Sequence, residues 1–464
     1  MKKNFLFGLI IWMIASGAQA QVSDEDALFL KKIHDYTLTD GKGYEWLRGL
    51  CETAPGRLAG SEAYDRAVNY SQTKLKEAGF DTVYLQACEV NYWRRGKPEK
   101  VEAVTKKGEK INLAALSLGN SEGTKGKTIE ASVIEVKGLD EVDKLGRSII
   151  EGKIVFYNRP MDPTQIRTFN AYGGAVDQRV FGASKAAEYG AIGVIVRSMT
   201  TRKDNHPHTG TLAYKDGIPK IPAMAISTIA ADQLSTLIKD GEIKSIQMTN
   251  DCGFVEKRQT HTVIAELKGT EYPNEIILVG GHLDSWDVGQ GAHDDGAGCV
   301  QSMEVLNTLL KLGYKPKRTI RCVLFANEEN GLAGGLEYAR VAKEKGEFHL
   351  AAIESDAGGF VPRGFSFDAH SDVLIPFYQA VTKWLPLFES YGLYFETGGS
   401  GADIGPLKDQ KGLLVGLRPD SQRYFDYHHT DIDNFDAINK RELELGAAAM
   451  ASLVYLIDKY GLEK

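Results

Sequence analysis

Residues 275–313 constrain the fold of this chain more than any other stretch. The run 275–279 is short, apolar and rich in β-branched side chains, which is typical of a buried strand. From Gly296 onward, apolar residues recur at helical spacing until Gly313, a residue type that commonly ends a helix. The loop between this strand and this helix is rich in polar groups that can bind a ligand, among them His282, Asp284, Asp294 and Asp295.

The position of these polar groups indicates a ligand site. In an open α/β sheet, ligands bind at the carboxyl ends of the strands, next to the following helices. Carboxylates crowded at such a place repel one another, and a divalent cation is the usual counter-charge. A solvated acidic loop after a core strand has the same composition. The stretch alone therefore leaves a metal site and a plain surface loop open.

The first twenty residues have the composition of a secretory signal peptide. Lys2 and Lys3 precede an apolar run that is too short to span a bilayer, and an Ala-x-Ala site ends at Ala20. We expect cleavage after Ala20 and an exported protein, either periplasmic or secreted. No later run approaches the length of a transmembrane helix, so we expect no membrane insertion after cleavage.

Charge and cysteine content exclude several functional classes. The chain has 55 basic and 62 acidic side chains and no basic tract, which argues against a nucleic-acid partner. Its five cysteines are few and odd in number for an exported protein, and none form a CxxC metal pattern. Cys299 and Cys322 fall in apolar segments and are expected to be buried, whereas a bridge from Cys51 to Cys88 stays open.

Strands and helices alternate through the second half of the chain. This alternation predicts an α/β fold with a doubly wound, mostly parallel sheet. The expected strands are 262–267, 275–280, 319–326, 350–355 and 412–417, and the expected helices are 297–312, 331–345, 371–384 and 438–460.

The middle of the chain has its own alternation of predicted strands and helices, separate from that of the second half. Residues 128–250 are expected to form a domain inserted into the main one. The main domain would then comprise a first part, 21–127, and a second part, 251–464, that contains the polar groups described above.

Further polar groups follow the other predicted strands. Each is ordinary by itself, because Glu-Glu commonly begins a helix and His-His is a common surface pair. Together they bring histidine, aspartate and glutamate to one edge of a sheet, which chance rarely does. The sequence therefore favours a metal site over a set of unrelated surface loops. These groups are Glu328 and Glu329 after strand 320–326, Asp356 after strand 351–354, and His428, His429 and Asp433 after strand 412–417.

At these positions the chain resembles the co-catalytic zinc exopeptidases, a family of aminopeptidases and glutamate carboxypeptidases. The resemblance implies a zinc exopeptidase domain, peptide substrates, two Zn²⁺ per chain and a homodimer. The inserted block is similar to a protease-associated domain. The resemblance rests on Gly281-His282-Leu283-Asp284-Ser285, Asp294 in Ala-x-Asp-Asp-Gly-x-Gly, Glu328-Glu329, Asp356 and His429-Thr430-x-x-Asp433.

The resemblance also implies a metal ligand role for five residues. Asp294 would bridge two Zn²⁺, with His282 and Asp356 completing one ion and Glu329 and His429 the other. Imidazole and carboxylate suit Zn²⁺, and two ions roughly 3.5 Å apart need an anionic bridge to offset their repulsion.

Three more residues receive catalytic roles from the resemblance. Glu328 would be the general base that takes a proton from the attacking water. Asp284 would orient the ring of His282. His428 stands where relatives often have an oxyanion-binding tyrosine, so an imidazole is expected in that role. The His-Thr-x-x-Asp pattern favours His429 as the ligand, although His428 stays an alternative.

Three further positions carry expectations of their own. Asp295 is expected to cap a helix and not to bind metal, and His293 is expected to be solvated. In the inserted domain, His208 lies in a polar loop, 204–210, and relatives use such a domain to cover the zinc cleft. We expect His208 to face the metal site and contact a peptide, with an exposed loop irrelevant to chemistry as the alternative.

The resulting functional hypothesis is an exported dinuclear zinc exopeptidase acting on dipeptides or short peptides. A broad-specificity zinc aminopeptidase is the second hypothesis, because it would use the same metals and base. A non-catalytic binding protein on the same fold is the third, and the intact set of ligands and base disfavours it. The preferred side chains stay open.

Overall fold

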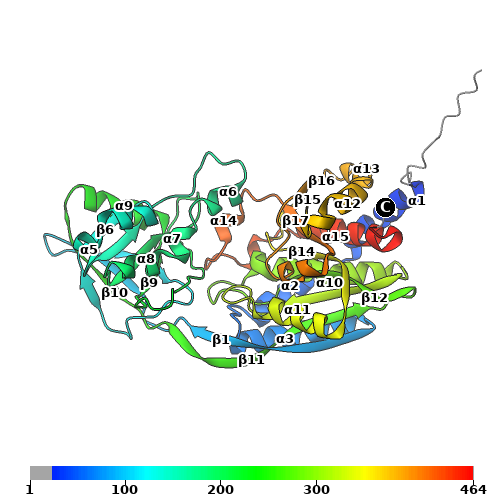
Figure 1. Cartoon of the computed structure of the whole chain (residues 1–464), viewed down its shortest axis with the longest axis horizontal. Helices are drawn as coiled ribbons and strands as arrows, with labels where there is room; N and C mark the ends of the chain where they lie inside the picture. The colour runs from blue at the N-terminus through cyan, green and yellow to red at the C-terminus, as the bar shows by residue number, and fades with distance from the viewer. Residues whose placement is uncertain (1–22, 463–464) are drawn as a thin grey trace, which may run out of the picture.

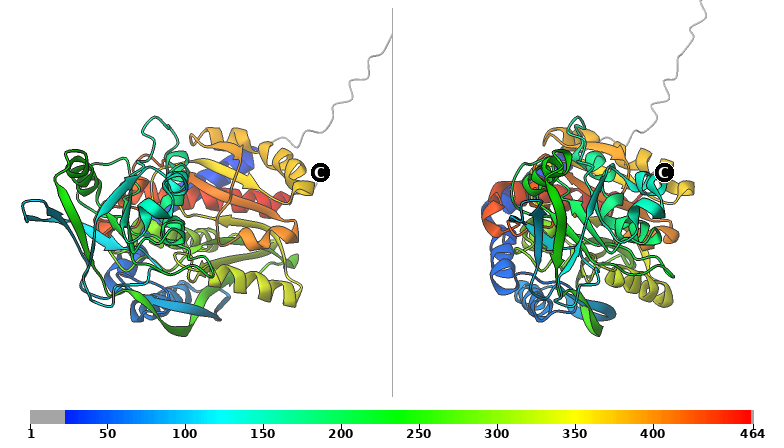
Figure 2. Two further views of the ribbon diagram at one scale, coloured as in Figure 1. Left: turned by 60° about the vertical axis from the view of Figure 1, so that its left-hand side comes forward. Right: turned by 90° about the vertical axis from the view of Figure 1, so that its left-hand side faces the viewer.

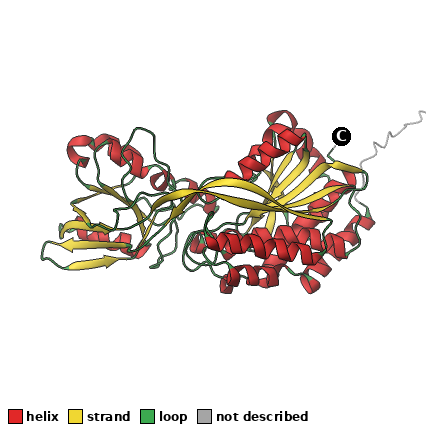
Figure 3. Cartoon of the chain, turned by 90° about the horizontal axis from the view of Figure 1, so that it is seen from below, coloured by secondary structure: helices red, strands yellow, loops and turns green. Residues whose placement is uncertain are grey.

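The computed structural model describes residues 23–462. The expected signal peptide lies outside the described residues. Two units are visible in Figure 1, and a pair of long strands, β1 (Thr82–Arg94) and β11 (Gly253–Leu267), runs from one unit to the other. Figure 3 shows this antiparallel pair crossing between the units as one continuous ribbon.

The larger unit is built on an eight-stranded sheet with the order β1-β11-β13-β12-β14-β17-β15-β16. Its central strands β13, β12, β14 and β17 are parallel, which confirms the predicted α/β fold. Strand β15 and the edge strand β16 were not predicted, because β15 begins at a proline and β16 has only four residues. The remaining bounds are β12 (Tyr272–His282), β13 (Arg318–Phe325), β14 (Phe348–Glu354), β15 (Pro362–Asp368), β16 (Tyr394–Thr397) and β17 (Leu413–Pro419).

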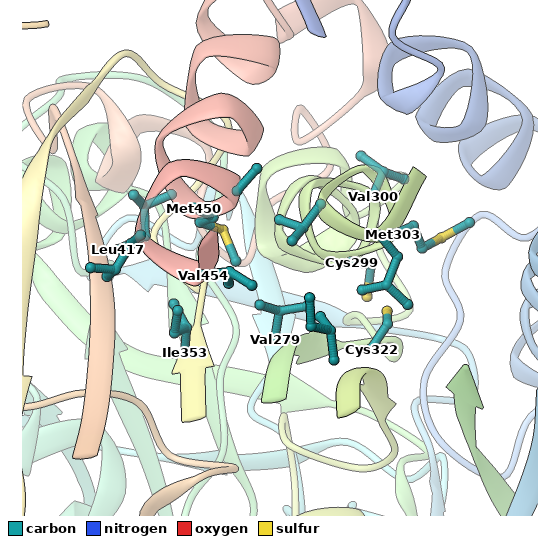
Figure 4. Packing of buried hydrophobic residues seen from close by; sticks show 14 of the residues in the cluster. Val279, Cys299, Val300, Met303, Cys322, Ile353, Leu417, Met450 and Val454 are labelled. Atoms are coloured by element: carbon teal, nitrogen blue, oxygen red, sulfur yellow. The ribbon is translucent and has the colours of Figure 1, made fainter. Parts of the chain in front are cut away.

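Helices cover both faces of this sheet. On one face, α10 (Ala297–Lys311) and α15 (Lys440–Tyr460) pack against the central strands, and Figure 4 shows side chains from both helices directed onto them. On the other face, α11 (Ala333–Lys345) covers a second apolar cluster. The other helices of this unit are α1 (Asp24–Asp40), α2 (Gly43–Thr53), α3 (Glu62–Ala78), α12 (Ser371–Thr382), α13 (Leu385–Glu389) and α14 (Tyr424–Tyr427).

Most of the predicted helices and strands are present, and they begin and end close to the predicted residues. The helix expected at 297–312 is α10, and the strand expected at 275–280 is β12. The largest difference is β11, which begins at Gly253 and not at residue 262. Its first half is exposed and polar, so it lacks the apolar pattern that identifies a buried strand.

The smaller unit contains two sheets, with the orders β3-β2-β10-β5 and β4-β9-β8-β7-β6. Its first strand, β2 (Lys100–Thr105), pairs with β10 (Ile243–Thr249), so this unit begins well before residue 128. The other bounds are β3 (Lys110–Leu113), β4 (Ala115–Ser117), β5 (Ile129–Ala131), β6 (Val133–Val136), β7 (Ile154–Tyr157), β8 (Gly193–Arg197), β9 (Ala223–Ile226), α4 (Leu139–Leu145), α5 (Arg147–Ile150), α6 (Thr168–Gly173), α7 (Asp177–Val180), α8 (Gly182–Glu188) and α9 (Thr228–Lys239).

The two units also meet beside α6 and α14, which lie between them in Figure 1, and Figure 2 shows the same chain from two further sides. The hydroxyl of Thr168 donates to the carbonyl of Ser421 at 2.8 Å. Arg167 forms an ion pair of 2.7 Å with Glu396 on β16. Phe169 packs against Phe425, with ring centroids 5.0 Å apart. The smaller unit is therefore held close to the carboxyl edge of the main sheet.

All five cysteines are buried and free, so the bridge from Cys51 to Cys88 is not formed. Cys299 and Cys322 pack in the main core, as predicted. Within residues 23–462, no helix combines the length and the apolar character needed to cross a membrane.

Candidate metal centre

The predicted ligands converge at the carboxyl edge of the main sheet. The parallel strands bring their ends to one place, because His282 at the end of β12 is in register with Phe325 at the end of β13. The loops that follow these strands, and the loop after α14, then supply the remaining groups. The residues brought together are His282, Asp294, Glu328, Glu329, Asp356, His428 and His429.

Asp294 lies at the centre of this group. One of its oxygens, Oδ1, is 3.2 Å from Nε2 of His282, and the other, Oδ2, is 3.2 Å from Nε2 of His429. Asp356 Oδ1 lies 3.5 Å from the same His282 nitrogen. Glu329 Oε2 lies 3.1 Å from the same His429 nitrogen. The residues thus form two sets of three that share one carboxylate.

The polar atoms in this cluster are better suited to binding a cation than to hydrogen bonding with one another. Oδ2 of Asp294 and Oε1 of Glu329 are buried, yet no described residue donates a hydrogen bond to them. Burial, reinforced by Asp294, raises the pKa of Glu329 to about 7. Burial also raises the pKa of Glu328 well above its ordinary value. Since several buried carboxylates cannot all be charged without a counter-charge, the donor set is chemically suited to Zn²⁺.

Asp284 supports the site differently from the expectation. The ring nitrogen Nδ1 of His282 is 3.0 Å from the backbone carbonyl of Asp284, whereas the nearer carboxylate oxygen is 3.8 Å away. The carboxylate accepts hydrogen bonds from the backbone N–H groups of Glu328, at 3.0 Å, and Glu329, at 3.3 Å. The main chain of Asp284 therefore orients the imidazole, and its side chain fixes the loop that carries the two glutamates.

Asp433 has a supporting role that the sequence did not reveal. Its two carboxylate oxygens accept the backbone N–H groups of His293, at 2.8 Å, and Asp294, at 3.1 Å. Asp433 was part of the recognised motif, but the motif gives no partner for it. In the structure it holds the main chain from which Asp294 projects.

Replacing Asp433 by asparagine should loosen the Asp294 loop. The amide keeps one acceptor but turns an NH₂ group toward a buried N–H, and such an unsatisfied donor costs about 1–3 kcal/mol. We expect a lower urea midpoint and weaker zinc retention. Asp431→Asn is the matched control, because its exposed carboxylate contacts only His206. Equal midpoints for the two variants would contradict this role of Asp433.

Asp295 and His293 lie beside the cluster. Asp295 accepts the backbone N–H of Gly298 at 2.9 Å, as a helix cap does, and also the N–H of His282 at 3.1 Å. The expectation that His293 is solvated was wrong. Its ring is buried and stacked on Phe360 with centroids 4.1 Å apart, and burial lowers its pKa to about 3.

The two adjacent histidines occupy different positions. His429 is the nearer to both Asp294 and Glu329, which favours it as the ligand. His428 stacks on it with ring centroids 3.5 Å apart, and its Nε2 lies 3.9 Å from Asp294. Burial and the neighbouring His429 hold the pKa of His428 well below its ordinary value, so this ring is neutral.

Loop 204–210 reaches the site through its backbone. Thr209 donates its N–H to the carbonyl of His429 at 3.0 Å, and its own carbonyl is 3.3 Å from Nδ1 of the same residue. His208 is buried, so the exposed-loop alternative was wrong. His208 is not among the described residues that line the adjacent cavity, and its contact with a peptide stays a prediction. The loop instead positions His429.

A cavity of about 530 Å³ lies between the cluster and the smaller unit. Drug-sized ligands occupy cavities of roughly 300–1,000 Å³, so this one can hold a small peptide. Both units contribute to its wall. The main unit supplies every cluster residue except His282, together with Asn330, Gly331, Leu332, Tyr424 and Phe425, and the smaller unit supplies Asn120, Phe169, Tyr172, Arg179, Thr211, Leu212 and Ala213.

Comparisons with known proteins agree with this geometry. The family model described as Peptidase family M28 matches residues 262–454. Carboxypeptidase Q of Bos taurus is 33% identical over 422 residues, which are 91% of this chain and 86% of that protein. This chain belongs to peptidase family M28. The Homo sapiens carboxypeptidase Q is also 33% identical, over 423 residues and the same shares of both chains.

Solved structures of M28 peptidases have the same architecture. The Peptidase M28 precursor from Shewanella amazonensis is 32% identical, covers 94% of this chain and 97% of its own, and has a TM-score of 0.88. A zinc aminopeptidase from Bacillus subtilis shares the fold at a TM-score of 0.63 with 18% identity, covering 89% of this chain and 94% of its own. This M28 protein is accordingly a zinc metallo-exopeptidase, and the similarity to carboxypeptidase Q confirms the expected resemblance to the zinc exopeptidases.

Proposed function

We propose that this M28 peptidase is a dinuclear enzyme that hydrolyses dipeptides or short peptides. The observation that carries the proposal is the position of Asp294, whose two oxygens each lie 3.2 Å from a different histidine. His282 and Asp356 would complete one zinc site, and Glu329 and His429 would complete the other. Zinc bound there would polarise the scissile carbonyl and lower the pKa of the attacking water.

Glu328 is the general base in this proposal. It lines the cavity next to Glu329, and the Asp284 carboxylate fixes its backbone. It takes a proton from the attacking water and passes it to the leaving amine. His428 also lines the cavity, and its neutral ring can donate one N–H to the oxygen of the carbonyl under attack.

Export and assembly complete the proposal. The basic start, short apolar run and Ala-x-Ala site of residues 1–20 are typical of a signal peptide, which supports an exported enzyme. The likeness to carboxypeptidase Q motivates a homodimer. The smaller unit, which reaches over the zinc cluster, is proposed to be a protease-associated domain that limits access to small substrates.

A broad-specificity aminopeptidase is the second candidate. Probable leucine aminopeptidase 2 of Aspergillus oryzae is 29% identical over 286 residues, which are 61% of this chain and 50% of that protein. The metals and base would be the same, so the candidates differ in which end of the peptide is recognised.

A panel of peptides separates the candidates. We expect the zinc-loaded enzyme to cleave unblocked dipeptides, with a chelator abolishing the reaction and zinc restoring it. An aminopeptidase would also cleave peptides amidated at the carboxyl end, and a carboxypeptidase those acetylated at the amino end. Mass spectrometry of the products identifies the bond cut. Wild-type enzyme that loads zinc but cleaves no member of the panel would contradict the proposal.

A further inference from the structure

Arg179 presents a buried positive charge without a protein partner. It lies on α7 of the smaller unit and is only 6% exposed. Its Nε and Nη1 atoms are buried and donate to no described residue, and within residues 23–462 no carboxylate lies at ion-pair distance. The guanidinium carbon lies 5.5 Å from the centroid of the Tyr172 ring. Burying an unpaired charge is costly, so such a group commonly awaits an anionic ligand.

The guanidinium lies next to the candidate zinc cluster. It lines the cavity that also contains Asp294 and Glu328. A carbon added at Gly210 would lie 2.5 Å from Cζ of Arg179 and 2.8 Å from Nδ1 of His429. Gly210 has a φ of +135°, a conformation that favours glycine. The glycine therefore allows the cationic group to lie close to an imidazole of the cluster.

The charges in the cavity are distributed unevenly. Among the described lining residues, the acidic side chains are those of Asp294, Glu328, Glu329 and Asp356, and all four belong to the cluster. Arg179 is the arginine among these lining residues, and it lies on the opposite wall of the cavity, which the smaller unit forms. The cavity thus offers a dedicated cation for a substrate carboxylate, whereas it offers no separate carboxylate for a substrate amine.

We infer that Arg179 binds the terminal carboxylate of the peptide, one residue beyond the scissile bond. A guanidinium forms paired, charge-assisted hydrogen bonds with a carboxylate, and burial strengthens them. An extended residue spans only about 3.5 Å, so a group this close to His429 reaches the residue that directly follows the scissile bond. This inference rests on the proposed function and narrows it to peptides from which a single carboxyl-terminal residue is released.

The aromatic side chains around Arg179 are consistent with this assignment. Phe169 and Tyr172 on α6 and Phe425 on α14 line the same cavity. The Tyr172 and Phe425 rings are stacked with centroids 4.8 Å apart, so they form a joint wall between the units. These side chains can enclose the side chain of the released residue while the guanidinium holds its carboxylate.

The test compares each dipeptide as a free acid and as a carboxyl-terminal amide. Wild-type enzyme should cleave the free acids with a kcat/KM at least on the order of 10-fold higher. Arg179→Met should lower kcat/KM for the free acids by about 10- to 100-fold and leave the amides nearly unchanged. Arg179→Lys should restore part of the preference, because it keeps the charge but loses the paired geometry.

Arg197→Met is the matched control. Arg197 is also a buried arginine of the smaller unit, but it is paired with Asp232 at 2.7 Å and does not line the cavity. This variant should keep the wild-type preference for free acids. Zinc content and melting temperature are measured for every variant, so that loss of folding is recognised.

Three results would overturn the inference while leaving the proposed function intact. The first is a wild-type enzyme that cleaves acids and amides equally. The second is an Arg179→Met enzyme that loses activity on both substrates equally, which would indicate that the arginine only shapes the wall. The third is an Arg179→Met enzyme with the wild-type preference. If Arg179→Met does not fold, the inference is tested by comparing how strongly the wild-type and Arg179→Lys enzymes prefer free acids over amides. A wild-type enzyme that cleaves neither form would instead contradict the proposed function.

Discussion

Replacing Glu328 by glutamine should leave the zinc content unchanged and lower kcat by roughly 100-fold or more, since positioned acid–base catalysis contributes about 10²–10⁴-fold. Glutamine keeps the shape of the side chain and the backbone N–H that Asp284 holds at 3.0 Å. It removes only the carboxylate that accepts the proton from water. Zinc is measured by mass spectrometry of the purified protein, and kcat by release of amino acids from an unblocked dipeptide.

The matched control is Glu337→Gln on α11. That carboxylate pairs with Arg340 at 2.7 Å on the protein surface, away from the cavity, so its loss should change neither zinc content nor kcat. A Glu328→Gln enzyme that retains most of its activity would remove Glu328 from the role of base. A variant that loses zinc would instead show that Glu328 helps to bind the metal.

The main sheet could be predicted because its local patterns are strong. Runs such as 275–279 are apolar throughout, as strands buried on both faces must be, and α10 is bounded by Gly296 and Gly313. Strands β15 and β16 could not be predicted, because β15 begins at Pro362 and β16 has only four residues. The start of the smaller unit at β2 could not be predicted either, because Lys100 pairs with Thr249, a residue far away in the sequence.

At the candidate site, too, some features could be predicted from the sequence and others could not. Residues at strand ends could be assigned to one edge of the sheet, because parallel strands place their carboxyl ends together. Which atom makes a contact could not be predicted, since this depends on loop geometry. Asp284 illustrates the point: its spacing from His282 suggested a carboxylate contact, but the backbone carbonyl makes it. His293 and His208 illustrate it too, because both polar side chains are buried by loops whose course no pattern specifies.

The last prediction concerns the proposed role of Asp294 as a bridge between two zinc ions. Asp294→Asn should weaken zinc binding more than Asp284→Asn does. In the first variant an NH₂ group replaces one of the two oxygens that face His282 and His429, and the negative charge between the two ions is lost. In the second, only the contacts to the backbone of Glu328 and Glu329 are disturbed, and losing such a supporting group costs roughly 10–100-fold in metal affinity or activity. Asp284→Asn should therefore retain much of its zinc.

Dialysis against graded concentrations of a chelator, followed by metal analysis, measures the difference. Wild-type protein should retain two zinc ions per chain to the highest chelator concentration, Asp284→Asn should lose them at an intermediate one, and Asp294→Asn should lose them first. Circular dichroism on the same samples verifies that each variant is folded. Because Asp284 holds the backbone of Glu328, its variant should also have a lower kcat per bound zinc, whereas Asp294→Asn should fail at the binding step itself. Equal zinc loss from the two variants would mean that Asp294 is not the bridge.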